Sequence, residues 1–147
     1  MALHKLNKES TKIFEYIISQ PKNVEGEYWK FDAHNYNPDD GGFMPLVVEQ
    51  LYNTTLLGRP VTAYSFAHYW IQNGDSMRDP EMCFYYDAEL HAVYPYYFRQ
   101  DPYFEEYSIL NNSDGMKYSP GMMKGQKDFA NMWMRNINEQ QRLGVKI

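Results

Sequence analysis

The sequence contains a single cysteine, Cys83, and no long run of apolar residues. One cysteine excludes an internal disulfide and a zinc site built from several cysteines. The longest apolar runs, such as Met82–Tyr86, are far shorter than the roughly 20 residues that cross a bilayer. The first residues are polar and lack the apolar core of a signal peptide. These absences predict a soluble, cytoplasmic protein that has no membrane partner.

The common motifs of catalysis and metal binding are also missing. The four histidines show neither the His-x₃-His spacing nor the HExxH pattern of zinc sites. Gly41-Gly42 lacks the lysine and serine of a phosphate loop, and no serine stands in a Gly-x-Ser-x-Gly turn. Cys83 lies between Met82 and Phe84, as expected of a buried structural thiol. We therefore expect no cofactor, and nothing in these patterns requires an enzyme.

Aromatic residues and acidic charge are what the sequence has in excess. Its 147 residues include 14 tyrosines, 8 phenylalanines and 3 tryptophans, and the net charge is −5. Residues 71–115 carry 2 basic and 9 acidic side chains, a balance of −7, whereas residues 116–147 carry 6 basic and 2 acidic ones, a balance of +4. Such asymmetry is typical of two separate contact surfaces, or of a basic helix beside an acidic sheet in one molecule.

Hydrophobic periodicity predicts one α+β domain over residues 1–147. Aromatic and β-branched runs with short connections favour an antiparallel meander, because a parallel crossover needs a dozen or more residues. We expect a sheet of about four strands, covered by two N-terminal helices and one long C-terminal helix. The expected helices begin after Asn7, at Pro45 and after Ser119, and the expected strands are Val61–Ile71, Met82–Asp87, His91–Arg99 and Tyr103–Leu110.

The stretch from Gln72 to Glu81 is the main candidate site, expected as a loop between two strands. Three carboxylates within seven residues suit a hard cation such as Mg²⁺ or Ca²⁺. The spacing matches no calcium loop, however, and Asn-Gly and Asp-Pro are common turn formers. The loop is therefore a candidate for interaction or for metal binding, without a firm metal prediction. Its candidate residues are Gln72, Asn73, Asp75, Arg78, Asp79 and Glu81.

A second set of candidate residues surrounds two histidines of the expected strands. His68 and His91 both fall in expected strands, Glu89 stands two residues before His91, and Arg99 ends the strand that His91 begins. A histidine among strand aromatics is more often a hydrogen-bonded packing residue than a catalytic one. These four residues remain candidates because a strand pairing can bring them together.

Three segments carry a resemblance to a known family. They are Gly42-Phe-Met-Pro-Leu-Val-Val-Glu49, Gln72-Asn-Gly-Asp-Ser-Met-Arg-Asp-Pro-Glu-Met82 and Asp128-Phe-Ala-Asn-Met-Trp-Met-Arg-Asn-Ile137. Together with Phe98-Arg-Gln-Asp101 they resemble a family of small uncharacterised bacterial proteins, a domain of unknown function found on plasmids, phages and conjugative elements. The resemblance implies a bacterial mobile-element setting and no catalytic residues.

Three functions are compatible with these features. The first is a non-enzymatic accessory protein that binds a protein partner, or a second copy of itself, through the acidic sheet and the Gln72–Glu81 loop. The second is a small divalent-cation-dependent hydrolase or nuclease that uses the carboxylates with His68 or His91. The third is nucleic-acid binding through the basic C-terminal helix, although its cations are dispersed; the acidic balance of the strands opposes binding through the sheet. The excess acid in the strand region favours the first.

Overall fold

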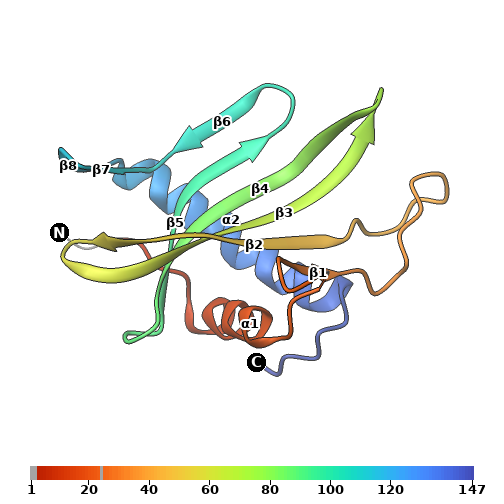
Figure 1. Ribbon diagram of the computed structural model, residues 1–147, viewed down its shortest axis with the longest axis horizontal. Helices are drawn as coiled ribbons and strands as arrows, with labels where there is room; N and C mark the ends of the chain where they lie inside the picture. Colours follow the sequence, from red (N-terminus) through yellow and green to blue (C-terminus); the bar gives the residue numbers. More distant parts are fainter. Residues whose placement is uncertain (1–2, 24) are drawn as a thin grey trace.

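The computed structural model describes residues 3–23 and 25–147. Within these residues a meander of strands lies between one helix at each end of the chain (Figure 1). The elements are α1 (Lys8–Ser19), β1 (Trp29–Phe31), β2 (Leu46–Leu56), β3 (Arg59–Gln72), β4 (Asp75–Asp87), β5 (Ala92–Gln100), β6 (Phe104–Tyr107), β7 (Ile109–Asn112), β8 (Gly115–Tyr118) and α2 (Pro120–Gln140).

The sheet is larger than the sequence predicts, and one expected helix is a strand. Strands β1 to β6 form one antiparallel sheet in chain order, and β7 pairs with β8 separately. The predicted four-strand sheet with three helices is therefore wrong. The segment expected as the second helix is β2, which pairs with β3 from Leu46 opposite His68 to Leu56 opposite Arg59. Leu57 and Gly58 have φ of 50° and 79°, as a tight hairpin turn requires.

The stretch expected as a loop from Gln72 to Glu81 is mostly strand as well. The turn consists of Asn73 and Gly74, with φ of 52° and 83°, and β4 begins directly after it. Pro80 lies inside β4, where the pairing with β3 shifts register between Ala67 and Tyr69. A register shift leaves a backbone group unpaired, so the missing N–H of proline is tolerated at this point.

The two terminal helices begin where the sequence indicates. Asn7 caps α1, since its side chain accepts a hydrogen bond of 2.8 Å from the backbone N–H of Ser10. Helix α2 starts at Pro120, and Ser119 occupies the N-cap position without a side-chain cap bond. None of the helices in the described residues is long and apolar enough to cross a membrane.

Both helices cover the same face of the sheet. Phe14 of α1 stacks on Phe66 of β3 with ring centroids 4.9 Å apart, and Phe129 of α2 meets the ring of Phe98 on β5 at 5.1 Å. Figure 1 shows α2 crossing behind the sheet. Side chains alternate along a strand, so the residues between these core positions point to the other side, which we call the open face. One of its rows runs Glu49, Ser65, Cys83, Tyr97 and Tyr107.

Candidate functional site

Two hairpin turns lie at one end of the sheet, at the upper right of Figure 1. The first joins β3 to β4 at Asn73-Gly74, and the second joins β5 to β6 at residues 101–103. We call this region, residues 71–75 with residues 101–105, the hairpin end. The backbone N–H of Asp101 donates to the carbonyl of Arg78 at 3.0 Å, which ties the second hairpin to the first.

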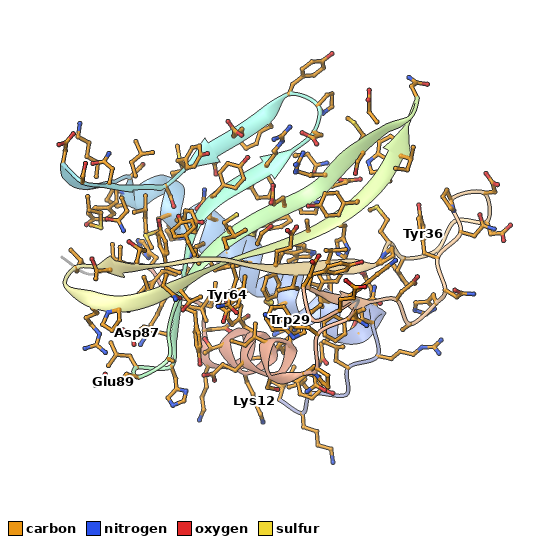
Figure 2. The ribbon with its side chains drawn as sticks, viewed as in Figure 1. Lys12, Trp29, Tyr36, Tyr64, Asp87 and Glu89 are labelled. Atoms are coloured by element: carbon orange, nitrogen blue, oxygen red, sulfur yellow. The ribbon has the colours of Figure 1, made fainter. Side chains whose placement is uncertain are left out.

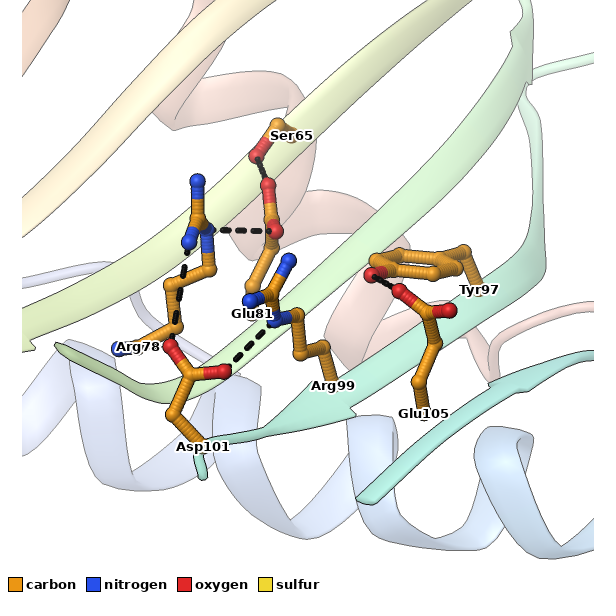
Figure 3. Close-up of polar contacts among 7 residues, drawn as sticks. All are labelled: Ser65, Arg78, Glu81, Tyr97, Arg99, Asp101 and Glu105. Atoms are coloured by element: carbon orange, nitrogen blue, oxygen red, sulfur yellow. Dashed lines mark hydrogen bonds and ion pairs between the residues drawn. The ribbon is translucent and has the colours of Figure 1, made fainter. Parts of the chain in front are cut away.

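A network of charged side chains on the open face fixes this connection (Figure 3). Asp101 accepts a bond of 2.6 Å from Nε of Arg99 and one of 2.8 Å from the backbone N–H of Arg78. The Arg78 guanidinium lies 3.7 Å from the same carboxylate and 3.1 Å from Oε1 of Glu81. Glu81 in turn accepts a bond of 2.6 Å from the hydroxyl of Ser65. The network joins β3, β4 and β5.

Strand register explains why these residues meet. Glu81 of β4 lies directly opposite Arg99 of β5 and Ala67 of β3, and opposite charges across a pair stabilise it. Beyond this pair the ladder reaches Pro80, which has no N–H to donate. Asp101 replaces the lost pairing, since its carboxylate and its own N–H bind both backbone groups of Arg78.

Burial and charge shift the ionisation of the network. The side chain of Asp101 is 6 % exposed, and burial raises the pKa of its carboxyl, but the hydrogen bonds from Arg78 and Arg99 outweigh this and leave the pKa below its usual value. The hydrogen bond to Asp101 raises the pKa of Arg99. The lowered pKa keeps Asp101 ionised at neutral pH. Nearby, Tyr97 donates a hydrogen bond of 2.5 Å to Glu105. Burial, and to a smaller extent this bond, raises the pKa of the Tyr97 hydroxyl.

Large apolar side chains are exposed around the network. Tyr103 is 96 % exposed, Ile71 59 % and Phe104 51 %. Tyr103 lies in the turn that follows Asp101 and Pro102, which the ion pairs hold in place. Phe104 begins β6, and its ring lies 5.8 Å from that of Phe98. Exposed aromatic side chains on an ordered turn are typical of a binding surface.

The carboxylates of the predicted loop do not converge. Asp75 lies exposed at the start of β4, Asp79 accepts a hydrogen bond from the side-chain amide of Gln100, and Glu81 binds Ser65 and Arg78. Over residues 3–23 and 25–147, no three His, Cys, Asp or Glu side chains are placed to hold a metal ion. The predicted Asn73 forms the turn, and the side chain of Gln72 lies outside the described part of the structure.

The two predicted histidines occupy different parts of the molecule. His68 is buried on the helix-covered face, with Nδ1 3.0 Å from the carbonyl oxygen of Pro45 and its ring against Trp133. His91 lies at the opposite end of β4 from the hairpin end and bonds to Glu15 of α1. Glu89 lies 3.8 Å from Arg59. Of this second set, only Arg99 belongs to the hairpin-end network.

Sequence reasoning missed Asp101, Tyr103 and Ser65. Asp101 falls between the expected strands His91–Arg99 and Tyr103–Leu110, and Tyr103 is only the first residue of the second. A signal was available, because an Asp-Pro pair follows an arginine within two residues twice, in Arg78-Asp79-Pro80 and in Arg99-Gln100-Asp101-Pro102. The first Asp-Pro lies inside β4 and the second in the β5–β6 turn, and the two arginines that precede them both belong to the network.

Much of the charge asymmetry is balanced inside the molecule. Asp87 of the acidic segment pairs with Arg59 at 2.6 Å. On α2, Lys124 pairs with Asp128 at 2.9 Å, and Arg135 reaches Glu9 of α1 at 2.9 Å. The cations of α2 therefore pair with carboxylates on α2 itself and on α1.

The chain belongs to the family of the domain of unknown function DUF6908, whose family model matches residues 12–143. The expected resemblance to a domain of unknown function is confirmed. Comparison with curated proteins and with solved structures gives no match. The family assigns no role to any residue of the site.

Proposed function

We propose that this chain is a non-enzymatic protein-interaction module whose hairpin end binds a basic segment of a partner protein. The observation that carries the proposal is the exposure of Tyr103, 96 % of its surface, on a turn that Asp101 fixes through Arg78 and Arg99. Tyrosine is among the residues that most often contribute strongly to protein interfaces. A turn that is already ordered loses little conformational entropy on binding, which favours affinity.

The charge of the hairpin end favours a basic partner. Arg78 and Arg99 are neutralised by Glu81 and Asp101, so their positive charge is not free to attract an acidic partner. Exposed carboxylates remain at both turns, on Asp75 and on Glu105. Carboxylates at the rim of an apolar patch speed association with cationic segments and repel acidic ones.

The setting of this interaction rests on the sequence resemblance. We propose that the module serves a bacterial mobile genetic element and works in the cytoplasm. The resemblance of the three segments around Gly42, Gln72 and Asp128 supports this part of the proposal. A tight, preorganised surface suits an accessory protein, whose task is to bind rather than to catalyse.

Panning a random-peptide display library on the immobilised chain tests the proposal. The double variant Tyr103→Ser/Phe104→Ser removes the exposed rings, and Leu110→Ser/Met132→Ser removes two similarly exposed apolar side chains, each 50 % exposed, away from the hairpin end. Circular dichroism of both variants checks that they keep the fold. Enriched peptides are expected to carry Lys or Arg and to bind Tyr103→Ser/Phe104→Ser at least about tenfold more weakly, a loss of about 1.4 kcal/mol.

Two results would contradict the proposal. One is a library from which no peptide is enriched. The other is a set of peptides that tolerates the loss of Tyr103 and Phe104, or that loses as much affinity for the control variant.

A further inference from the structure

A groove lies at the other end of β4, far from the hairpin end. It runs between α1 and the β4–β5 turn and has a volume of about 460 Å³. One wall of the groove carries Lys5 of the N-terminal segment and Lys8 and Lys12 of α1, and the β4–β5 turn contributes His91. Figure 2 shows Lys12 projecting from α1, with Asp87 and Glu89 marking the neighbouring turn. The volume falls in the range of about 300–1,000 Å³ that holds small ligands.

The three lysines give the groove a positive charge that the carboxylate of Glu15 offsets only in part. Among the described residues none of them forms an ion pair with a carboxylate, whereas Arg59, Arg78, Arg99 and Arg135 all do. Lys12 donates a bond of 2.6 Å to the carbonyl oxygen of Lys146, and a carbonyl does not neutralise an ammonium group. A chain with a net charge of −5 thus concentrates free ammonium groups in one groove.

Glu15, the acidic side chain among the described residues that line the groove, is held by two hydrogen bonds. Oε2 of Glu15 accepts a bond of 2.5 Å from the hydroxyl of Tyr86 and one of 2.6 Å from Nδ1 of His91. A carboxylate only accepts hydrogen bonds, so Nδ1 of His91 carries a proton and the ring is held in a fixed orientation. Among the described residues, Nε2 of His91 has no hydrogen-bond partner, and the side chain is 72 % exposed. The ring therefore presents one free nitrogen beside the three ammonium groups.

We propose that this groove binds a small phosphorylated molecule, with the lysines binding its phosphate oxygens and Nε2 of His91 contacting the same group. Lysine ammonium groups bind phosphate as point charges. When Nε2 carries a proton it donates a hydrogen bond to a phosphate oxygen. A nucleic-acid strand would need cations along an extended surface, whereas these lie within one groove. The occupant is therefore a small molecule.

Nuclear magnetic resonance titration of the full chain with inorganic pyrophosphate, AMP and adenosine tests the proposal. The ring signals of His91 report on the groove, and those of His34, which lies 2.7 Å from the carbonyl oxygen of Gln140, serve as an internal control. Lys5→Gln/Lys8→Gln removes two charges from the groove. Lys30→Gln/Lys117→Gln removes two exposed lysines elsewhere and changes the net charge equally.

Pyrophosphate and AMP are expected to shift the His91 signals, and adenosine is not. Lys5→Gln/Lys8→Gln should weaken binding about tenfold or more, and Lys30→Gln/Lys117→Gln should leave it within about twofold. Tighter binding of AMP than of pyrophosphate would identify an organic phosphate as the occupant, and equal binding would identify a site for the phosphate group alone; both support the proposal. No His91 shift at millimolar ligand, or equal weakening by the two double variants, would overturn it.

Discussion

Replacing Asp101 by asparagine tests whether the ion-pair network holds the hairpin end together. The substitution keeps the shape of the side chain and removes the negative charge between Arg78 and Arg99. Asparagine has one acceptor oxygen where aspartate has two. Either the backbone N–H of Arg78 or Nε of Arg99 therefore loses its acceptor, and the other keeps a neutral one.

The cost follows from the geometry of the two bonds. A buried N–H left without an acceptor costs about 1–3 kcal/mol, and exchanging a charged acceptor for a neutral one loses roughly half of a 1.5–3 kcal/mol bond. The side chains of Arg78 and Arg99 are 33 % and 35 % exposed, so water compensates part of the loss. We expect Asp101→Asn to lower the free energy of unfolding by about 2–3 kcal/mol. For a chain of this size the melting temperature falls by about 4–12 °C.

Urea unfolding of wild type and variant at pH 7, 4 and 3 measures this effect. The pKa of Asp101 is lowered in the folded protein, so its stabilisation is complete above the ordinary aspartate pKa of about 3.9 and is lost as pH falls through the lower folded pKa. The difference between the proteins should therefore shrink below about pH 4. The control Asp75→Asn, at an exposed position of the same end, should change stability by less than about 0.5 kcal/mol. Equal effects of the two substitutions, or a difference that stays constant down to pH 3, would refute the reasoning.

Three further predictions concern buried side chains. Burial lowers the pKa of His68, so the unfolded chain binds a proton at this histidine more readily than the folded chain. The free energy of unfolding should therefore fall as the pH drops below about 6.5, by about 1.4 kcal/mol for each unit by which the pKa is lowered. Urea midpoints measured from pH 7 to 5 should fall less steeply for His68→Gln than for the wild type. Burial raises the pKa of the Cys83 thiol to about 12, so Ellman's reagent should react with it in urea but not in the native protein at pH 8. Phe14→Ala removes a ring that is fully buried and stacked on Phe66, and urea unfolding should show a loss of about 3–5 kcal/mol.

The ends of the chain were the parts of the fold that sequence reasoning placed well. Asn7 and Ser119-Pro120 are local signals: a cap or a proline acts on the residues next to it. The buried positions of α1, Ile13, Phe14 and Ile17, recur with the helical period. Each of these signals is complete within one turn or two of helix, so no knowledge of distant residues is needed.

Strand β2 was mistaken for a helix because its pattern is ambiguous without its partner. Its buried residues are Leu46, Val48 and Leu56, and a register shift between Gln50 and Tyr52 breaks the alternation that would mark a strand. Leu46, Gln50 and Leu51 also fit a helical stripe. The hydrogen bonds to β3 decide the outcome, and they come from a segment that follows in the chain. A bulge that interrupts alternation hides a strand from any local pattern.

The candidate carboxylates failed to converge for the same physical reason. Asp79 and Glu81 are two residues apart, and in a regular strand they would share a face. The register shift at Pro80 separates them. Glu81 pairs with Ser65 on the open face, whereas Asp79 bonds to Gln100, which lies two residues after Phe98 and shares its helix-covered side. Because of the same register shift, the backbone of Arg78 is bound by Asp101. One register shift thus separates the two carboxylates and allows the network at the hairpin end to form.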